Sequence, residues 1–355
     1  MKVLLVLKNF DFGGAENHVC DLANSLVDLG NEVILVSGKG RQESRLNKKV
    51  VFIPYRLRDH GFLFNIYLLR KIIKKNNIDI IHAHQRISIF YSCIISKLLK
   101  VPLVVTIHGR TRLDLKSKLT RNTPGRLIFV SEQVLKVSAC YNQIKEKSVV
   151  IPNGVEIIEN DFPRKPFSIC YVSRLDHKHA EVVLMMIRDV LPLLLSKYPE
   201  ISFYVIGEGK GSKYIQAEAD SLNMKSNKQV CFILGFQQEV KEIFLESSLV
   251  MGVGRVAIEA LACGVPVFSI NQKRLGSIVT VENIDFYQIN NFVAVGNQPP
   301  TPDAVYRTLD EFYKNIERHY SEIKLLQEKI RQNFDRTKVT QKIVRIYDEA
   351  LLINR

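Results

Sequence analysis

The stretch Leu249–Phe268 reads LVMGVGRVAIEALACGVPVF. It begins as an apolar strand, turns at Gly252 and Gly254, continues with a helical pattern, and ends in a second apolar strand. A strand, a glycine turn and a helix N-terminus bring free backbone N–H groups and the positive end of the helix dipole together, which suits a phosphate. Glu259, one turn inside the helix, is placed to accept hydrogen bonds, for example from ribose hydroxyls. The alternative is a βαβ unit whose glycines only permit close packing.

Apolar strands alternate with helical patterns along the rest of the chain. Helical periodicity fills residues 15–29, 62–76 and 180–197. Strands that are apolar throughout and separated by helices indicate parallel sheets covered on both faces, so we predict an α/β protein with doubly wound sheets. The predicted strands are residues 3–7, 33–36, 78–82, 103–107, 127–130, 148–151, 167–172, 202–206, 230–234, 249–251 and 265–270.

The chain has 355 residues, which is long enough for two domains with separate cores. Turn-forming residues and prolines gather at 152–166, where we place the joint. We predict a first Rossmann-like domain over 1–157 and a second over 158–335. The final helix, 336–355, is expected to pack back on the first domain.

The positive charge is confined to the first half of the chain. Residues 1–152 hold 25 Lys and Arg against 11 Asp and Glu, a balance of +14, whereas residues 153–355 hold 25 of each. Basic clusters at Arg70–Lys75 and Arg110–Arg121 interleave cations with Leu and Ile, as an interfacial helix does. This pattern favours an anionic partner such as a membrane surface or a pyrophosphate-linked substrate, although a solvated basic face is the alternative. Nucleic acid is the weaker candidate because the aromatic residues lie mainly in apolar runs.

Cysteines and hydropathy narrow the protein class. The six cysteines are scattered without a Cys-x-x-Cys pair, which fits reduced thiols and neither a disulfide framework nor a zinc site. No apolar run approaches the roughly 18 residues of a membrane span. We therefore expect a cytoplasmic protein, with peripheral membrane contact through the basic first domain.

Four further motifs follow predicted strands. They are Gly13–Glu16 after the first strand, His108 after residues 103–107, a pair of cations (Arg174 and Lys178) after residues 167–172, and Gly207–Gly209 after the next strand. Open α/β sheets bind ligands at the carboxyl ends of their strands. These motifs therefore predict ligand-binding sites.

Taken with residues 150–155 (VIPNGV) and 259–267 (EALACGVPV), these motifs resemble the retaining glycosyltransferases of family 4, also described as glycosyl transferases group 1. The resemblance covers nearly the whole chain. It implies the GT-B fold, in which two Rossmann-like domains face a central cleft, and a nucleotide-diphosphate sugar as donor substrate.

The resemblance implies roles for single residues. Arg174 and Lys178 hold the donor diphosphate and stabilise its charge as it leaves. Glu259 binds the ribose, and Gly13 and Gly14 let the backbone approach the donor phosphates.

Further positions complete the implied site. His108 lies beside the transferred sugar and contributes a hydrogen bond, so His108, Arg174 and Lys178 form the expected catalytic set. Gly235 and Phe236 lie near the nucleobase. Glu16 and His84 are expected to lie on the acceptor side of the site.

One departure from the family concerns the donor sugar. Members carry two glutamates eight residues apart, and the position eight before Glu259 is Met251, which cannot accept hydrogen bonds from sugar hydroxyls. The loop between strand and helix also looks short. Backbone amides near Gly254 and Arg255 are expected to hold the diphosphate instead.

No metal and no cofactor are expected. The chain has no Asp-x-Asp motif that could clamp a divalent ion on the diphosphate, so we predict metal-independent transfer. His82 and His84 look like a metal pair, but no third ligand is expected nearby, so we assign them to the acceptor side or to structure.

The leading hypothesis is a retaining glycosyltransferase, with UDP-sugars favoured, that extends a glycan or lipid-linked acceptor in the synthesis of a surface polysaccharide such as lipopolysaccharide or capsule. A non-catalytic nucleotide-binding partner subunit and a nucleotide-sugar epimerase of the same fold are the alternatives. Residues 252–257 also match the dinucleotide fingerprint G-x-G-x-x-A, but the acidic residue expected about 20 positions later is missing, which disfavours a nicotinamide enzyme.

Overall fold

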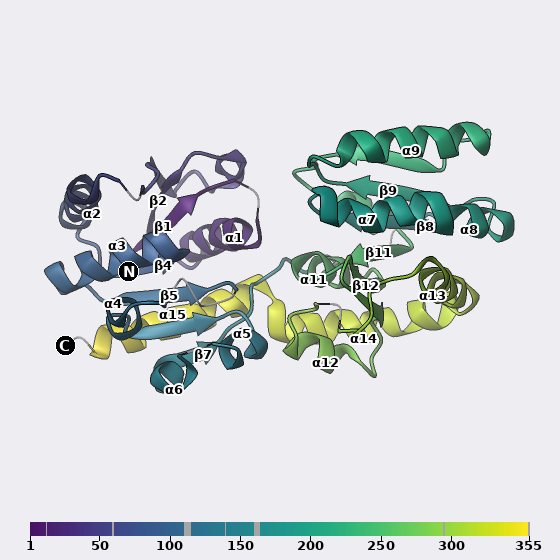
Figure 1. Ribbon diagram of the computed structural model, residues 1–355. Helices are drawn as coiled ribbons and strands as arrows, with labels where there is room; N and C mark the ends of the chain where they lie inside the picture. Colours follow the sequence, from purple (N-terminus) through teal and green to yellow (C-terminus); the bar gives the residue numbers. More distant parts are fainter. Residues whose placement is uncertain are drawn as a thin grey trace. The chain divides into compact units, whose positions relative to one another are not determined.

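A computed structural model describes residues 1–11, 13–58, 60–109, 115–138, 140–159, 164–293 and 295–353. The chain divides into two compact units (Figure 1). Unit 1 comprises Met1–Val155 and Asn333–Arg355, and unit 2 comprises Glu156–Gln332. Part of the expected joint, residues 160–163, and part of the second basic cluster, residues 110–114, lie outside the described residues.

Unit 1 is built on a parallel seven-stranded sheet in the order β3-β2-β1-β4-β5-β6-β7. The strand order reverses between β1 and β4, which is the switch point where such sheets bind ligands. The strands are β1 (Lys2–Asn9), β2 (Glu32–Gly38), β3 (Val51–Pro54), β4 (Ile80–His84), β5 (Leu103–Ile107), β6 (Arg126–Phe129) and β7 (Ser148–Val150).

Both faces of this sheet are covered, as the apolar strands predict. One core joins the sheet to α1 and α15, and the other joins it to α2 and α3; Figure 1 shows α15 against the strands. The helices of unit 1 are α1 (Gly14–Asp28), α2 (Phe62–Asn76), α3 (Arg86–Leu99), α4 (Lys118–Asn122), α5 (Glu132–Lys136), α6 (Tyr141–Ile144) and α15 (Arg336–Ile353), with short 3-10 turns η1 (Arg41–Arg45) and η2 (Lys145–Lys147).

Unit 2 repeats the same plan with six strands in the order β10-β9-β8-β11-β12-β13. The order again reverses between the first and fourth strands of the unit, β8 and β11. The strands are β8 (Ser168–Val172), β9 (Ser202–Ile206), β10 (Cys231–Gly235), β11 (Leu249–Gly252), β12 (Val267–Asn271) and β13 (Arg274–Ile278), and β13 alone among these pairs antiparallel.

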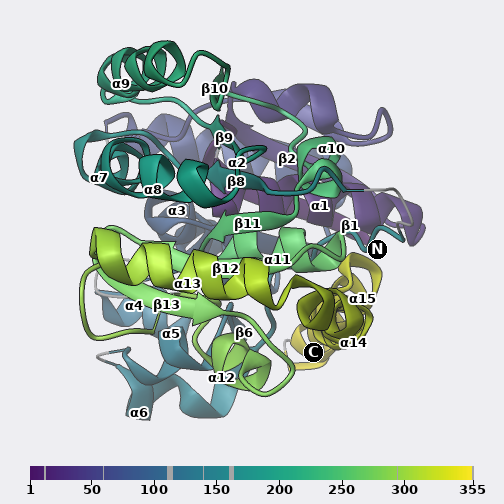
Figure 2. The same cartoon turned by 90° about the vertical axis from the view of Figure 1, so that its right-hand side faces the viewer.

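Helices also cover both faces of the second sheet. The large core packs α7, η3, α8, α9 and α13 on one face, and Figure 2 shows α7 and α8 in line. The helices are α7 (His177–Met185), the π-helical turn η3 (Met186–Val190), α8 (Leu191–Lys197), α9 (Ser212–Lys225), α10 (Lys241–Glu246), α11 (Arg255–Ala262), α12 (Ile284–Ile289), α13 (Pro302–Lys314) and α14 (Ile316–Phe334).

The doubly wound α/β prediction is confirmed. Each predicted strand has a counterpart within a few residues, and the three predicted helices are present. Two edge strands, β3 and β13, were not predicted. β3 is four residues long and ends in Pro54, and β13 is interrupted by Gly276, so neither has the length or apolar pattern of a buried strand.

The two segments that connect the units pair with each other inside unit 1. The Val155 N–H donates to the Phe334 carbonyl at 2.7 Å, and the Arg336 N–H donates to the Val155 carbonyl at 2.9 Å. A Cβ at Gly154 would come within 2.8 Å of the Arg336 Cα. Glycine at position 154 therefore permits this close approach.

The expectations about the cysteines and about membrane-spanning segments can be compared with the structure. None of the six cysteines, which all lie within the described residues, forms a disulfide. Among the described helices, none has both the length and the apolar character required to cross a bilayer.

Candidate functional site

The carboxyl ends of the strands of unit 2 collect the residues predicted to bind the donor. Arg174 follows β8, Gly207 follows β9, Gly235 ends β10 and Gly254 follows β11. In the sheet these strands are neighbours, in the order β10-β9-β8-β11. Arg174 and Gly254 therefore flank the switch point.

The two cations predicted to hold the diphosphate, Arg174 and Lys178, lie on either side of the start of α7. Asp176 caps this helix, since its carboxylate accepts from the His179 backbone N–H at 3.1 Å and contacts the His179 Nδ1 at 2.5 Å. These hydrogen bonds lower the pKa of the Asp176 carboxyl. Arg174 and Lys178 are exposed on either side of the cap, so their charged ends are accessible to an anion.

Glycines fix the path of the Arg174 loop against the loop that follows β9. Gly207 has φ +136°, and a Cβ there would lie 1.8 Å from the Ser173 carbonyl oxygen. A Cβ at Gly209 would lie 2.2 Å from the Leu175 carbonyl carbon. Hydrogen bonds from the Ser173 N–H to Ile206 (3.1 Å) and from the Leu175 N–H to Glu208 (2.9 Å) hold the two loops together. Position 207 therefore requires glycine on two independent grounds, sterics and φ.

The turn between β11 and α11 is as short as the sequence suggests. β11 ends at Gly252 and α11 begins at Arg255. Gly254 has φ +60°, and its N–H donates to the Phe292 carbonyl at 2.9 Å. Met251 lies within the strand and is fully buried in the core. The position eight residues before Glu259 is therefore a core position, and the Met251 side chain packs in the core of unit 2.

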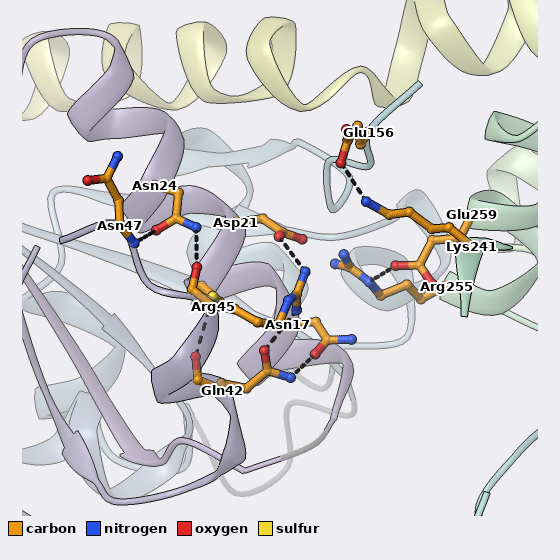
Figure 3. Close-up of polar contacts among 11 residues, drawn as sticks. Asn17, Asp21, Asn24, Gln42, Arg45, Asn47, Glu156, Lys241, Arg255 and Glu259 are labelled. Carbon is orange, nitrogen blue, oxygen red and sulfur yellow. Dashed lines mark hydrogen bonds and ion pairs between the residues drawn. The ribbon is translucent and has the colours of Figure 1, made fainter. Parts of the chain in front are cut away.

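Arg255 and Glu259 form an ion pair on the first turn of α11 (Figure 3). The Arg255 Nε donates to the Glu259 Oε1 at 2.7 Å, and the two side chains are 13% and 18% exposed. A carboxylate accepts about four hydrogen bonds, so Glu259 keeps capacity for two ribose hydroxyls while Arg255 fixes its orientation. The sequence did not predict this pairing, although the i,i+4 spacing of opposite charges is its signal.

The predicted nucleobase residues lie at the edge strand of the unit 2 sheet. Gly235 has φ +65°, and its carbonyl accepts from the Gly207 N–H at 2.8 Å. Phe236 is half-buried beside it. These contacts tie the end of β10 to the Gly207 loop, and contact with a base stays a prediction.

In unit 1 the predicted glycines open α1. A Cβ at Gly14 would meet no atom within 4 Å, and the atom nearest to a Cβ at Gly13 would be a carboxylate oxygen of the flexible Glu16 side chain, at 2.2 Å. Packing therefore does not require glycine at position 14. This space is consistent with the expected approach of a phosphate.

Glu16 is held by a residue that the sequence analysis missed. The Gln85 side chain donates to the Glu16 Oε1 at 2.6 Å and accepts from the Lys8 N–H at 3.3 Å. Gln85 follows β4 at the switch point and has φ +65°, an unusual backbone for a residue with a side chain. Strained residues gather at functional sites, and only the position of Gln85 directly after a strand could have suggested this role.

Three imidazoles meet at the carboxyl edge of unit 1, from α1, β4 and the residue after β5. The His84 Nδ1 lies 3.1 Å from the His108 Nε2. The His18 ring centroid lies 5.2 Å from that of His108 and 5.8 Å from that of His84. The expectation that His84 has no third potential ligand nearby is therefore wrong. Residues that are far apart in the sequence become neighbours here because β4 and β5 are adjacent parallel strands.

His82 lies behind this cluster with both ring nitrogens engaged. Its Nδ1 contacts the Tyr347 hydroxyl at 2.6 Å and its Nε2 contacts the Thr106 hydroxyl at 2.7 Å. Burial and the His108 charge lower the pKa of His82 to about 3. Burial, with smaller contributions from the other imidazoles, also holds the pKa of His84 well below its usual value. His82 therefore has a structural role.

A polar network joins α1 to the segment that follows β2 (Figure 3). The Arg45 guanidinium contacts the Asp21 carboxylate at 3.2 Å and donates to the Gln42 Oε1 at 2.8 Å. The Asn24 side chain donates to the Arg45 carbonyl at 2.8 Å and accepts from the Asn47 N–H at 2.8 Å. The network fixes the η1 turn against α1.

A separate ion pair joins the start of unit 2 to α10. The Lys241 ammonium contacts the Glu156 carboxylate at 2.5 Å (Figure 3).

A cavity of about 820 Å³ opens in unit 1. It lies beside Gln85 and is lined by three cations and three aromatic rings, Lys8, Arg86, Lys116, Phe62, Phe90 and Tyr91. This volume is in the range of small-molecule sites. Cations beside aromatic rings suit a ligand with an anionic group and an apolar part.

Two family models match the chain in succession. The model described as Glycosyltransferase Family 4 matches residues 12–158, and the model described as Glycosyl transferases group 1 matches residues 155–325. The chain belongs to this family of glycosyltransferases. The enzyme is a transferase that uses nucleotide sugars. Family membership favours this assignment over an epimerase, a nicotinamide enzyme or a non-catalytic subunit.

Curated relatives and solved structures agree with this family. The enzyme is 28% identical over 326 residues to an uncharacterized glycosyltransferase of Methanocaldococcus jannaschii, covering 84% of this chain and 85% of the relative. It is 24% identical to a phosphatidyl-myo-inositol mannosyltransferase of Propionibacterium freudenreichii, and the match covers 84% of this chain and 83% of that relative. Anabaena HepE, solved in complex with UDP, has the same fold with a TM-score of 0.72 at 18% identity, over 97% of this chain and 99% of that chain.

Proposed function

We propose that this enzyme transfers a sugar from a UDP-sugar to a lipid-linked glycan acceptor, with retention of configuration and without a metal ion. The acceptor belongs to the synthesis of a surface polysaccharide, and the reaction takes place at the cytoplasmic face of a membrane. The observation that carries the proposal is the carboxyl edge of the unit 2 sheet. Two accessible cations and an oriented carboxylate flank the switch point there.

The donor half of the proposal follows from charge. As the bond from the anomeric carbon to the diphosphate breaks, negative charge grows on the leaving oxygen. Arg174 can grip phosphate oxygens with two N–H groups, and Lys178 adds a point charge. Glu259, held by Arg255, accepts from the ribose hydroxyls. UDP is favoured as the nucleotide because a solved structure with this fold contains it.

The acceptor half rests on unit 1. The cavity beside Gln85 combines three cations with aromatic rings, which suits a diphosphate next to a lipid chain. His108 is partly exposed at the same sheet edge and is proposed to hydrogen-bond the transferred sugar. The Propionibacterium relative is named for a phospholipid acceptor, which supports a lipid-linked acceptor here.

Membrane contact is proposed through α2. Its first two turns expose four large apolar side chains, and its later turns expose four cations. A helix that presents apolar residues beside Lys and Arg binds anionic lipid surfaces. The residues are Phe62, Leu63, Phe64, Tyr67, Arg70, Lys71, Lys74 and Lys75.

The proposal is tested by a transfer assay in the presence of a chelator. The purified enzyme is incubated with UDP-, GDP- or ADP-sugars and isolated polyprenyl-diphosphate-linked glycans, and the product linkage is determined by NMR. We expect transfer from a UDP-sugar with the anomeric configuration retained. No transfer from any of these donors would overturn the proposal. Transfer that appears only after a divalent ion is restored would overturn its metal-independent part.

A further inference from the structure

The imidazole cluster of unit 1 is the His18–His84–His108 triad. One nitrogen from each of the three residues can be chosen so that all three lie within 4.8 Å of one another. His84 is fully buried, His18 is 4% exposed and His108 is partly exposed. Three imidazoles are thus held together on one sheet edge by α1, β4 and the chain after β5.

The donor set suits a transition-metal ion. Imidazole nitrogen binds Zn²⁺ at about 2.0–2.1 Å, and in a tetrahedral site this bond length separates two ligand nitrogens by roughly 3.3 Å. The observed 3.1 Å between the His84 Nδ1 and the His108 Nε2 is already close to that separation. One nitrogen of His18 lies within 4.8 Å of one nitrogen of each of the other two rings, so a side-chain adjustment of His18 would complete the set.

His82 supports three ligands rather than four. Both of its nitrogens are hydrogen-bonded, to Tyr347 and Thr106, and its ring lies 4.2 Å from that of His84. It therefore fixes the position of His84 without competing for an ion. The His84 Nδ1 faces the His108 Nε2, and the His84 Nε2 is buried without a hydrogen-bond partner among the described residues. Apart from its contact with His108, no hydrogen bond therefore holds the His84 ring in that part of the chain.

We propose that His18, His84 and His108 together bind one divalent transition-metal ion of the Zn²⁺ class. Three histidine nitrogens leave a fourth coordination position for water or an exogenous ligand. All three ligands of this site belong to unit 1, whereas Arg174 and Lys178, which are proposed to hold the donor diphosphate, belong to unit 2.

One consequence rests on the proposed function. His108 cannot give the same nitrogen to a metal ion and to a hydrogen bond with the transferred sugar. Metal binding is therefore expected to inhibit transfer. For each protein, inhibition is the loss of rate relative to the rate of the same protein without metal. This inhibition is expected to be weaker in His18→Gln than in the unaltered enzyme.

The binding test needs neither donor nor acceptor. Untagged full-length enzyme is stripped with a chelator, dialysed, and titrated with Zn²⁺ by calorimetry and with Co²⁺ by visible absorption. We expect one equivalent of Zn²⁺ to bind and Co²⁺ to give the spectrum of a tetrahedral site. His84→Gln and His18→Gln should each weaken Zn²⁺ binding by about 100-fold or more, because each removes a direct ligand and loss of an outer-shell partner alone costs about 10–100-fold.

Two controls keep the test decisive. His60→Ala removes an exposed imidazole of the same unit and should leave Zn²⁺ binding unchanged. Circular dichroism checks that each variant is folded, and His18→Gln serves if the buried His84→Gln does not fold. Absence of both the Zn²⁺ heat and the Co²⁺ spectrum, or unchanged affinity in His18→Gln, would overturn the proposal. Calorimetry with UDP tests the donor proposal separately, so the two can fail independently.

Discussion

The two sheets of this enzyme share a strand order but differ in the chemistry at their carboxyl edges. In unit 1 the switch point is flanked by a buried imidazole, His84, a partly exposed imidazole, His108, and the amide of Gln85. In unit 2 the equivalent edge has accessible cations, Arg174 and Lys178, and a half-buried ion pair on α11. The same backbone plan therefore provides two sites, one suited to anions and one to neutral hydrogen bonding or metal ligation.

Replacing a cation at the unit 2 edge is expected to have the largest effect. Arg174→Ala should lower kcat/KM by about 100- to 1,000-fold, because it removes charge stabilisation of the leaving diphosphate. Steady-state transfer kinetics measure this loss. The matched control is Arg188→Ala, which removes an exposed arginine paired with Glu218 in the same unit and should change kcat/KM less than about twofold. Equal losses in the two variants would remove the distinction between the edge and the ordinary surface.

The unit 2 edge also depends on the backbone of the Gly207 loop. Gly207→Ala should lower the free energy of unfolding by about 3 kcal/mol, since φ +136° disfavours any side chain and the Cβ would overlap the Ser173 carbonyl. Urea denaturation followed by circular dichroism measures this change. Gly30→Ala is the control, because φ is also positive at Gly30, +80°, but an added Cβ there would meet no atom within 4 Å. This substitution should lower the free energy of unfolding by only about 1–2 kcal/mol. Similar losses at both sites would contradict the close packing of the two loops.

The ion pair on α11 gives a graded test. Glu259→Gln should weaken UDP binding by about 10- to 100-fold, because it removes a charged acceptor of the ribose hydroxyls. Arg255→Lys should weaken binding less, since it keeps the charge but changes the donor that orients Glu259. Calorimetry measures both, with Glu218→Gln as a surface control. If Arg255→Lys weakened binding more than Glu259→Gln, the positioning role of Arg255 would be wrong.

The smallest expected effect concerns the membrane surface proposed for unit 1. Leu63 is 81% exposed on α2, and Leu63→Asn should reduce binding to anionic lipid vesicles by several-fold, because one leucine side chain contributes about 1.5–3 kcal/mol when fully buried and less at an interface. Vesicle sedimentation measures the bound fraction. Leu325→Asn, at an exposed position of α14 in unit 2, should leave binding unchanged. A similar decrease for both variants would argue against docking through α2.

The sequence predicted most of the fold because its strands are apolar throughout and are separated by helices. The positions predicted for the donor site of unit 2 lie at the carboxyl edge of its sheet, because each motif follows an apolar strand, and their role in donor binding stays a prediction. The sequence did not predict the contacts among them, because the pairing of Arg255 with Glu259 depends on side-chain geometry. In unit 1, the third imidazole near His84 was missed because only the sheet brings α1, β4 and β5 together. Gln85 was missed because a positive φ outside glycine leaves no trace in the sequence.

The central claim, that the unit 2 edge binds the nucleotide diphosphate, is tested most directly by calorimetry with UDP in the presence of a chelator. We predict binding by the unaltered enzyme, at least about tenfold weaker binding by Arg174→Ala, and unchanged binding by His84→Gln, which alters only the unit 1 edge. No binding of UDP, GDP or ADP by the unaltered enzyme, or equal binding by Arg174→Ala, would contradict the claim.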